Sequence, residues 1–359
     1  MRGLDLRADR EEYLDALLVT GTAFILAVAQ WRHIVHFFDQ YLLQNLQAEV
    51  GVLQGYPHWR FFQSRVLAPF LEHLIELTGV NLTSAHAVVA VFGLTGAGLA
   101  LFYAAQAAAG QGAASQGADG RQKAWTALLA MHVLFMALMS KPWLYIWDFV
   151  LLLTTAVFYL LVLTRAPWWA FLALLGVACF NHESAVFIGG YMMAKAVIDA
   201  WVEKRRPDWR WLASGLLGSV AAFAIIEFLR KMLLKEEVGY KIFRDIQKSS
   251  STTFDAYFHI QVGENFGQFY DWITDPSLSL DLLIPIYLAT VLGLTAVMVK
   301  RHGVRALSLA AFVLVQVLAV LALGLTNETR TLLHLIPFVA LAGIWLKKPT
   351  AEAPGPFAP

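Results

Sequence analysis

The sequence is short of charged residues and almost without cysteine. Asp, Glu, Lys and Arg make up 15% of its 359 residues, whereas soluble domains carry about 25%. The formal net charge is +1, and the absence of a basic domain argues against a nucleic-acid partner. The single cysteine, Cys179, excludes an intramolecular disulfide, a CxxC redox motif and a zinc ribbon. These absences leave few classes of soluble protein open.

Several functional signatures are also missing. The chain has no His-Glu-x-x-His or His-x-x-x-His spacing, which argues against an intramembrane metal hydrolase. We find no internal repeat of the kind that inverted-repeat transporters show. Residues 1–13 are charged and polar, so we expect the first apolar run to be a retained span rather than a cleavable signal peptide.

What the chain has instead is long runs of apolar residues. Hydrophobic residues make up 58% of the sequence and the mean hydropathy is +0.58, as in multi-span membrane proteins. Runs of about 17–25 apolar residues predict membrane-spanning helices, and we expect about ten of them. They lie at residues 14–35, 84–107, 125–139, 145–163, 168–180, 185–201, 212–229, 280–299, 306–325 and 332–346.

The predicted fold class is therefore an all-α polytopic membrane protein. We expect one transmembrane domain at 1–348, with outer loops at 39–83 and 230–279, and a disordered tail at 349–359. Within the first loop, residues 65–77 place Glu72, His73 and Glu76 on one helical face and mostly apolar residues on another. This pattern predicts an amphipathic juxtamembrane helix on the outer side rather than a further span.

Lys and Arg in the short connections indicate the orientation. With ten spans, most of these residues fall on one side, which the positive-inside rule assigns to the cytoplasm. They are Arg2, Arg7, Arg10, Arg121, Lys123, Arg165, Lys204, Arg205, Arg206, Arg210, Lys300, Arg301, Arg305, Lys347 and Lys348. We therefore expect a multi-pass protein of the bacterial inner (plasma) membrane, with both termini in the cytoplasm.

Polar residues gather on the opposite, outer side. An ionisable His-Glu pair between two apolar runs is costly unless it is solvated or paired, which makes the 181–184 hairpin tip a functional candidate. The expected topology brings together Asp39, His58, Arg60, Arg65, Lys141, Asn181, His182, Glu183, Glu328 and Arg330. Arg binds phosphate through forked donors, and a carboxylate can take a proton from a hydroxyl group. This set therefore predicts a substrate that carries phosphate.

The acidic and histidine positions also have structural explanations. Asp39 can be a charge that ends a helix at the membrane surface, and His182 with Glu183 can be a solvated hairpin cap. Asp39 and three histidines could together form a metal site. These histidines, His33, His36 and His58, lack tight ligand spacing, so no metal ligand is assigned.

The basic positions have alternatives too. Arg60, Arg65 and Lys141 can extend to lipid headgroups instead of a substrate phosphate. Glu328 and Arg330 can form a local ion pair of little energy. The residues alone do not decide between these explanations.

The arrangement of these segments is similar to that of a known enzyme family. Asp39 follows the first span at once, and residues 62–69 end a loop that is expected to hold juxtamembrane helices. Residues 181–187 and 327–330 form short polar hairpin tips. In these features the chain resembles the GT-C-type glycosyltransferases, polytopic membrane enzymes that use a polyprenyl-phosphate-linked sugar.

The resemblance implies inverting transfer of a sugar from a polyprenyl-phosphate donor to a glycan, lipid or protein acceptor at the outer face. Asp39 is then the candidate base on the acceptor hydroxyl, and Glu183 is a catalytic-site residue that orients groups or balances charge. Substrate binding falls to His58, Arg60, Arg65, Lys141, Asn181, His182, Glu328 and Arg330. No cofactor is certain, and a divalent metal is compatible with this chemistry.

Two other functions stay open. One is a transporter or flippase of a lipid-linked or anionic substrate, and the other is a non-catalytic member of an envelope polysaccharide complex. A transporter would place charged residues near the middle of its spans. The polar clusters here lie at the outer ends of the spans, which favours chemistry at the surface.

Overall fold

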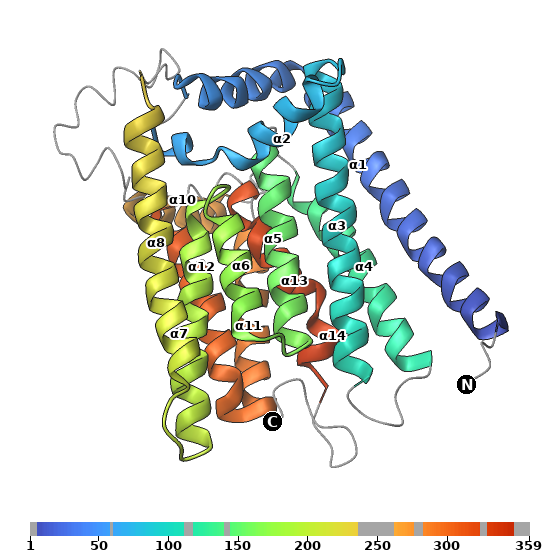
Figure 1. Ribbon diagram of the computed structural model, residues 1–359, viewed down its shortest axis with the longest axis vertical. Coiled ribbons are helices and arrows are strands. Elements are labelled where there is room, and N and C mark those ends of the chain that lie inside the picture. Colours follow the sequence, from blue (N-terminus) through green and yellow to red (C-terminus); the bar gives the residue numbers. More distant parts are fainter. Residues whose placement is uncertain are drawn as a thin grey trace.

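The computed structural model describes residues 6–57, 60–110, 118–139, 144–235, 262–275, 283–323 and 329–347. Within these ranges every regular element is a helix (Figure 1), which confirms the all-α class. The elements are α1 (Leu6–Gln54), η1 (Arg60–Ser64), α2 (Leu67–Glu76), α3 (Leu82–Gly110), α4 (Ala118–Leu138), α5 (Ile146–Leu163), α6 (Trp168–Ala178), η2 (Glu183–Ala185), α7 (Val186–Val202), α8 (Trp209–Leu233), α10 (Val262–Thr274), α11 (Leu283–His302), η4 (Gly303–Ala306), α12 (Leu307–Leu323), η5 (Thr329–Leu335), α13 (Ile336–Ala340) and α14 (Ala342–Trp345).

Six stretches of the described chain are long and apolar enough to cross a membrane. They are Tyr13–Asp39, Leu82–Ala109, Ile146–Leu163, Glu183–Val202, Trp209–Leu233 and Leu283–Ala322. The chain is thus an α-helical, multi-pass integral membrane protein whose apolar helices contact the bilayer. The predicted count of about ten spans is not confirmed.

Four differences separate six from ten. The run predicted at 125–139 forms α4, which is not among the six because its first turns carry the charged residues Asp119, Arg121 and Lys123. Helix α6 has only 11 residues, about half of what a bilayer requires. The run predicted at 332–346 is divided among η5, α13 and α14, the last two with five and four residues. The two spans predicted at 280–299 and 306–325 lie in one candidate stretch, as α11 and α12 joined by η4.

Helix α1 is bent at Phe38, where the backbone leaves helical geometry at φ −128° and ψ 24°. The first part of α1 runs obliquely along one edge of the bundle, and the part after the bend lies across its upper end as drawn in Figure 1. We call this end, which also carries η1 and α2, the upper end. The bend brings Glu49, with a fully buried side chain, over the bundle.

Close packing of α7 against α8 depends on glycine. A Cβ atom added to Gly189 would lie 2.6 Å from the carbonyl oxygen of Gly215 and 2.0 Å from Oγ of Ser219. Lipid supplies no hydrophobic force to hold membrane helices together, so close packing must do so. Small residues allow this packing because they let the two backbones touch. This contact holds α7 and α8 side by side below the hairpin tip at 181–184.

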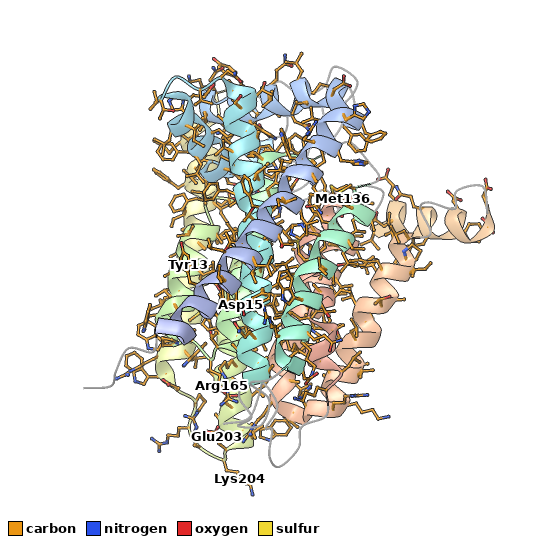
Figure 2. All side chains as sticks on the ribbon, turned by 90° about the vertical axis from the view of Figure 1, so that its right-hand side faces the viewer. Tyr13, Asp15, Met136, Arg165, Glu203 and Lys204 are labelled. Atoms are coloured by element: carbon orange, nitrogen blue, oxygen red, sulfur yellow. The ribbon has the colours of Figure 1, made fainter. Side chains whose placement is uncertain are left out.

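Basic residues mark the lower end of the bundle. Arg165 and Lys204 lie at this end in Figure 2, and Arg121 near the start of α4 forms an ion pair with Asp15 of α1. These residues were predicted to share one side of the membrane. The structure places Arg165 and Lys204 at the end opposite η1 and α2 (Figure 2).

The juxtamembrane helix predicted at 65–77 forms α2, and one residue of its polar face, Glu72, is buried. Phe70, Leu71 and Leu74 are exposed, whereas Glu72 is only 2% exposed. This arrangement suits a protein whose solvent is partly lipid, because apolar side chains can face outward at no cost. Nδ1 of His86, in α3, lies 2.7 Å from this buried carboxylate.

Candidate functional site

The hairpin tip between α6 and η2 is fixed from two sides. Asn181 is fully buried, and its Nδ2 donates a hydrogen bond to the Trp147 carbonyl of α5 at 2.9 Å. The backbone N–H of Leu67, at the start of α2, donates to the carbonyl of Phe180 at 2.9 Å. Asn181 therefore positions the tip, and its predicted contact with substrate stays a prediction.

Glu183 stands at the centre of a charged group that we call the Glu183 cluster, formed with Ser64, Arg65 and Arg230. Its Oε2 accepts a hydrogen bond from Nη2 of Arg65 at 3.0 Å. Its Oε1 accepts from Nη2 of Arg230 at 2.8 Å and from Oγ of Ser64 at 3.0 Å. The side chains of Arg65 and Arg230 are 8% and 4% exposed. One carboxylate thus binds two buried guanidinium groups, those of Arg65 and Arg230.

This geometry bears on the role of Glu183. Both of its oxygens already accept charge-assisted hydrogen bonds, which are about twice as strong as neutral ones. Burial lowers the pKa of Arg65, while the neighbouring carboxylate of Glu183 opposes that shift and Arg330 adds to it. The arrangement fits a residue that orients arginines and balances their charge.

A third arginine lies beside this cluster. Nη1 of Arg330, in η5, lies 3.7 Å from Oδ2 of Asp148 in the first turn of α5. The guanidinium carbons of Arg65 and Arg330 lie 4.7 Å and 5.8 Å from the ring centroid of Phe62. Arg330 also lies 4.9 Å from the ring centroid of Tyr145. Such cation–π contacts hold the charges in place and leave their N–H groups to other acceptors.

His182 lies beside the cluster, with Nδ1 at 3.6 Å from Oε2 of Glu183. Its Nδ1 accepts a hydrogen bond from the backbone N–H of Ser184 at 3.2 Å, and Ser184 Oγ lies 3.0 Å away. Burial lowers the pKa of His182 to about 3, and the positive charge of Arg65 acts in the same direction. The imidazole is therefore neutral at physiological pH, and a hydrogen-bond acceptor at Nδ1.

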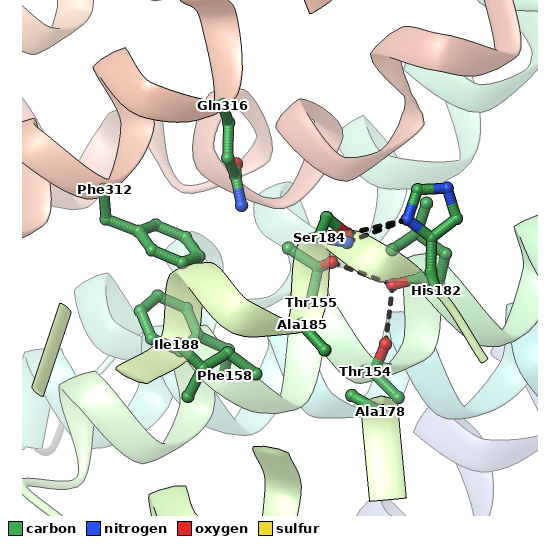
Figure 3. Close-up of a pocket in the computed structure, with 11 residues that line it drawn as sticks. Thr154, Thr155, Phe158, Ala178, His182, Ser184, Ala185, Ile188, Phe312 and Gln316 are labelled. Atoms are coloured by element: carbon green, nitrogen blue, oxygen red, sulfur yellow. Dashed lines mark hydrogen bonds between the residues drawn. The ribbon is translucent and has the colours of Figure 1, made fainter. Parts of the chain in front are cut away.

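A small cavity adjoins His182 between α5, α7 and α12 (Figure 3). Its volume is about 20 Å³, and its polar lining comes from Thr154, Thr155, His182, Ser184 and Gln316. A cavity of this size holds a water molecule and nothing as large as a sugar. A substrate of sugar size therefore does not fit in this cavity of the described structure.

The remaining predicted residues are either exposed or outside the described part of the structure. Asp39 is exposed and follows the bend of α1 at once. Arg60 begins η1, but its side chain is outside the described part of the structure, and His58, Lys141 and Glu328 lie wholly outside it. Their assigned roles stay predictions. The structure brings together Arg65, His182 and Glu183, with Arg330 close by.

The sequence did not predict the contacts of two groups of residues. The apolar pattern predicted Arg230 at the start of an outer loop. Glu227 precedes it by three residues, which is the spacing of an ion pair within a helix. This ion pair forms at 3.0 Å. The other group consists of Glu49, Glu72 and His86, which we call the carboxylate–histidine cluster. No sequence signal links its three members, because they come from three different helices.

The carboxylate–histidine cluster is deeply buried, with Glu49, Glu72 and His86 at 0%, 2% and 1% exposure. Nδ1 of His86 lies 2.9 Å from Oε2 of Glu49 and 2.7 Å from Oε1 of Glu72. Oε1 of Glu49 accepts a hydrogen bond from the backbone N–H of Ile146 at 2.8 Å. Burial raises the pKa of Glu72 to about 8, and the charge of Glu49 adds to this effect.

No protein-family model, curated protein or solved structure matches this chain.

Proposed function

We propose that the chain is a membrane glycosyltransferase resembling the GT-C type, which moves a sugar from a polyprenyl-phosphate donor to an acceptor at the outer face of the membrane. One observation supports this proposal above the others. Arg65, Arg230 and Arg330 converge at the upper end with the carboxylates of Glu183 and Asp148. Three buried or nearly buried guanidinium groups at one end of a membrane bundle suit a phosphate held at headgroup depth.

The chemistry of phosphate supports this assignment. A guanidinium group offers a planar fork of donors that matches phosphate oxygens, and it stays charged when buried. Arg330 is the residue that we assign to the donor phosphate, because its guanidinium group lies at the upper end beside Phe62 and Tyr145, outside the group of residues that binds Glu183. Arg65 and Arg230 are engaged by Glu183 and would add to the positive field at that point.

Asp39 is the candidate base in this proposal. Its carboxylate is exposed beside the bend of α1, where an acceptor can approach from the aqueous side. Glu183 keeps the arginines in place and takes no proton. Because the phosphate leaves as an anion, rate acceleration would come from positioning and from the fixed positive charges.

The side of the membrane follows from charge. Arg165 and Lys204 lie at the lower end, and the positive-inside rule assigns such short basic connections to the cytoplasm. The Glu183 cluster then faces outward, where a lipid carrier presents sugars for the cell envelope. We propose the bacterial inner membrane as the location on this basis.

One observation favours a second candidate, transport of a lipid-linked or anionic substrate. The cavity beside His182 carries Thr154, Thr155 and Gln316 within the bundle, and polar groups at such depth mark substrate paths in transporters. Its small volume makes transport the weaker proposal in this conformation.

The test uses the full chain in proteoliposomes with a polyprenyl-phosphate-linked sugar and a short glycan acceptor. We expect sugar transfer to the acceptor, with an increase of about tenfold or more in donor KM for Arg330→Gln, equivalent to about 1.4 kcal/mol of lost binding. Arg210→Gln, an exposed position in the first turn of α8, serves as the matched control. Movement of intact donor between leaflets without sugar transfer would instead support transport and reject the transferase.

A further inference from the structure

The carboxylate–histidine cluster brings together three side chains that bind metals in other proteins. Glu49 comes from the part of α1 after the bend, Glu72 from α2 and His86 from α3. A ligand atom from each of them lies within 4.8 Å of the other two. Three separate elements thus direct two carboxylates and one imidazole to a single point.

The hydrogen bonding within this cluster is incomplete. Nδ1 of His86 carries at most one hydrogen, yet two carboxylate oxygens lie within 2.9 Å and 2.7 Å of it. The contact with Glu49 has hydrogen-bond geometry. Oε1 of Glu72, although the nearer atom, is buried without a donor. A buried acceptor with no donor costs about 1–3 kcal/mol, and more if it is charged.

The cluster also lacks positive charge from Lys or Arg among the groups that act most strongly on Glu72. The groups that act most strongly on Glu72 are Glu49, His86 and Glu76, and none of these is Lys or Arg. The rings beside His86 are those of Trp31 and Phe149, whose centroids lie 5.0 Å and 6.4 Å from the imidazole centroid. Two buried carboxylates therefore face each other with a single imidazole between them.

We propose that Glu49, Glu72 and His86 bind one divalent transition-metal ion, Mn²⁺ or Zn²⁺. Carboxylate oxygens and an imidazole nitrogen are ligands that both ions accept. The ion gives Oε1 of Glu72 a partner and balances the two carboxylates. This inference does not depend on the proposal of sugar transfer.

The position of the site indicates what the ion does. The second oxygen of Glu49 is oriented by the backbone N–H of Ile146 at 2.8 Å, as an outer-shell contact orients a ligand. Ile146 lies two residues before Asp148, which contacts Arg330. A bound ion would thus join α1, α2 and α3 next to the arginines and fix the upper end of the bundle.

The test counts ions on the full-length chain purified in detergent. The protein is stripped with EDTA, incubated with Mn²⁺ or Zn²⁺, desalted and analysed by plasma mass spectrometry. We expect one ion per chain, and occupancy in Glu72→Gln of about one-tenth of the wild-type value or less. Glu76→Gln, one turn further along α2 and paired with His73 on the surface, should bind as the wild type does. An empty wild-type protein, or equal binding by Glu72→Gln, overturns the proposal.

Unfolding temperature gives a second measurement. The ion should raise the unfolding temperature of the wild type and of Glu76→Gln, and leave that of Glu72→Gln unchanged, because a ligand stabilises only the state that binds it. If Glu72→Gln does not fold, Co²⁺ added to the wild type should show absorption bands of a nitrogen- and oxygen-ligated site that Zn²⁺ displaces. A wild type with neither bands nor an ion-dependent unfolding temperature also overturns the proposal.

Discussion

Arg230 donates a hydrogen bond to Glu183 at 2.8 Å, from the last turn of α8 to the hairpin tip between α6 and α7. Arg65 holds the other carboxylate oxygen at 3.0 Å from the segment before α2. A single carboxylate therefore connects three parts of the chain that are distant in sequence. Charge holds the upper end together at this point, whereas apolar contacts and close glycine packing hold the helices below it.

The first prediction concerns this connection. Glu183→Gln removes the charge that compensates Arg65 and Arg230, and we expect a loss of about 3 kcal/mol in unfolding free energy. This is the low end of the range for breaking a buried ion pair, because Glu183 itself is 27% exposed. Glu203→Gln, which breaks an exposed pair with Arg205, should cost under about 1 kcal/mol. Urea unfolding in detergent measures both, and equal effects would contradict the role of Glu183.

The second prediction concerns pH. The pKa of His182 is 6.5 in the unfolded chain, and burial lowers it to about 3 in the folded protein. Between these values the unfolded chain binds more protons, so His182 reduces stability as pH falls below about 6.5. The expected loss between pH 7 and pH 5 is about 2 kcal/mol from this residue.

His182→Asn isolates this contribution. Asn can accept the hydrogen bond from the backbone N–H of Ser184, since it is a good residue at this capping position, and it does not titrate. The variant should therefore lose less stability than the wild type when its unfolding is compared at pH 7 and pH 5. Other titrating groups are common to both proteins and cancel in the comparison. Equal losses would show that the ring of His182 is readily protonated in the folded state.

The third prediction uses two adjacent glycines of α7. Gly189→Ala places a Cβ atom against the backbone of Gly215, and we expect a loss of about 1–3 kcal/mol from overpacking. Gly190→Ala meets nothing within 4 Å and should be neutral or stabilising by up to about 1 kcal/mol, because Ala favours the helix. Thermal unfolding of the two variants in one detergent checks the difference. Similar unfolding temperatures would contradict the close contact of α7 with α8.

The fourth prediction tests Asp39 as the base. Asp39→Asn should reduce sugar transfer by about 10²–10⁴-fold, the usual contribution of a general base, and leave donor binding and unfolding temperature unchanged. The stability expectation follows from the exposure of Asp39 beside the bend of α1. Asp15→Asn, which alters an exposed pair with Arg121, is the control for a lost surface carboxylate. Full transfer activity in Asp39→Asn would remove this residue from catalysis.

Hydrophobic pattern predicted most of the helices and none of their irregularities. The runs at 84–107 and 145–163 appear as α3 and α5 with ends shifted by at most three residues. The bend at Phe38 and the division of 332–346 into short helices depend on contacts across the bundle. Such contacts leave no periodic signal in the local sequence, so only the structure reveals them.

The sequence predicted the site only where the order of the spans placed residues on the same side of the membrane. Shared sidedness brought Arg65 and Glu183 into one group, and their ion pair is present at 3.0 Å. Arg230 was missed because the end of α8 extends beyond the apolar run that predicted it. Glu72 was recognised as part of a polar helical face, but its partner His86 lies inside an apolar span, where a single histidine gives no warning of a buried contact.

The two faces of α2 determine how this helix can move. A half-turn about its own axis would expose Glu72 to the hydrocarbon edge and press Phe70 and Leu74 against His86, so lipid and protein both resist rolling. Burial of Glu72 thus fixes the rotation of α2 about its own axis.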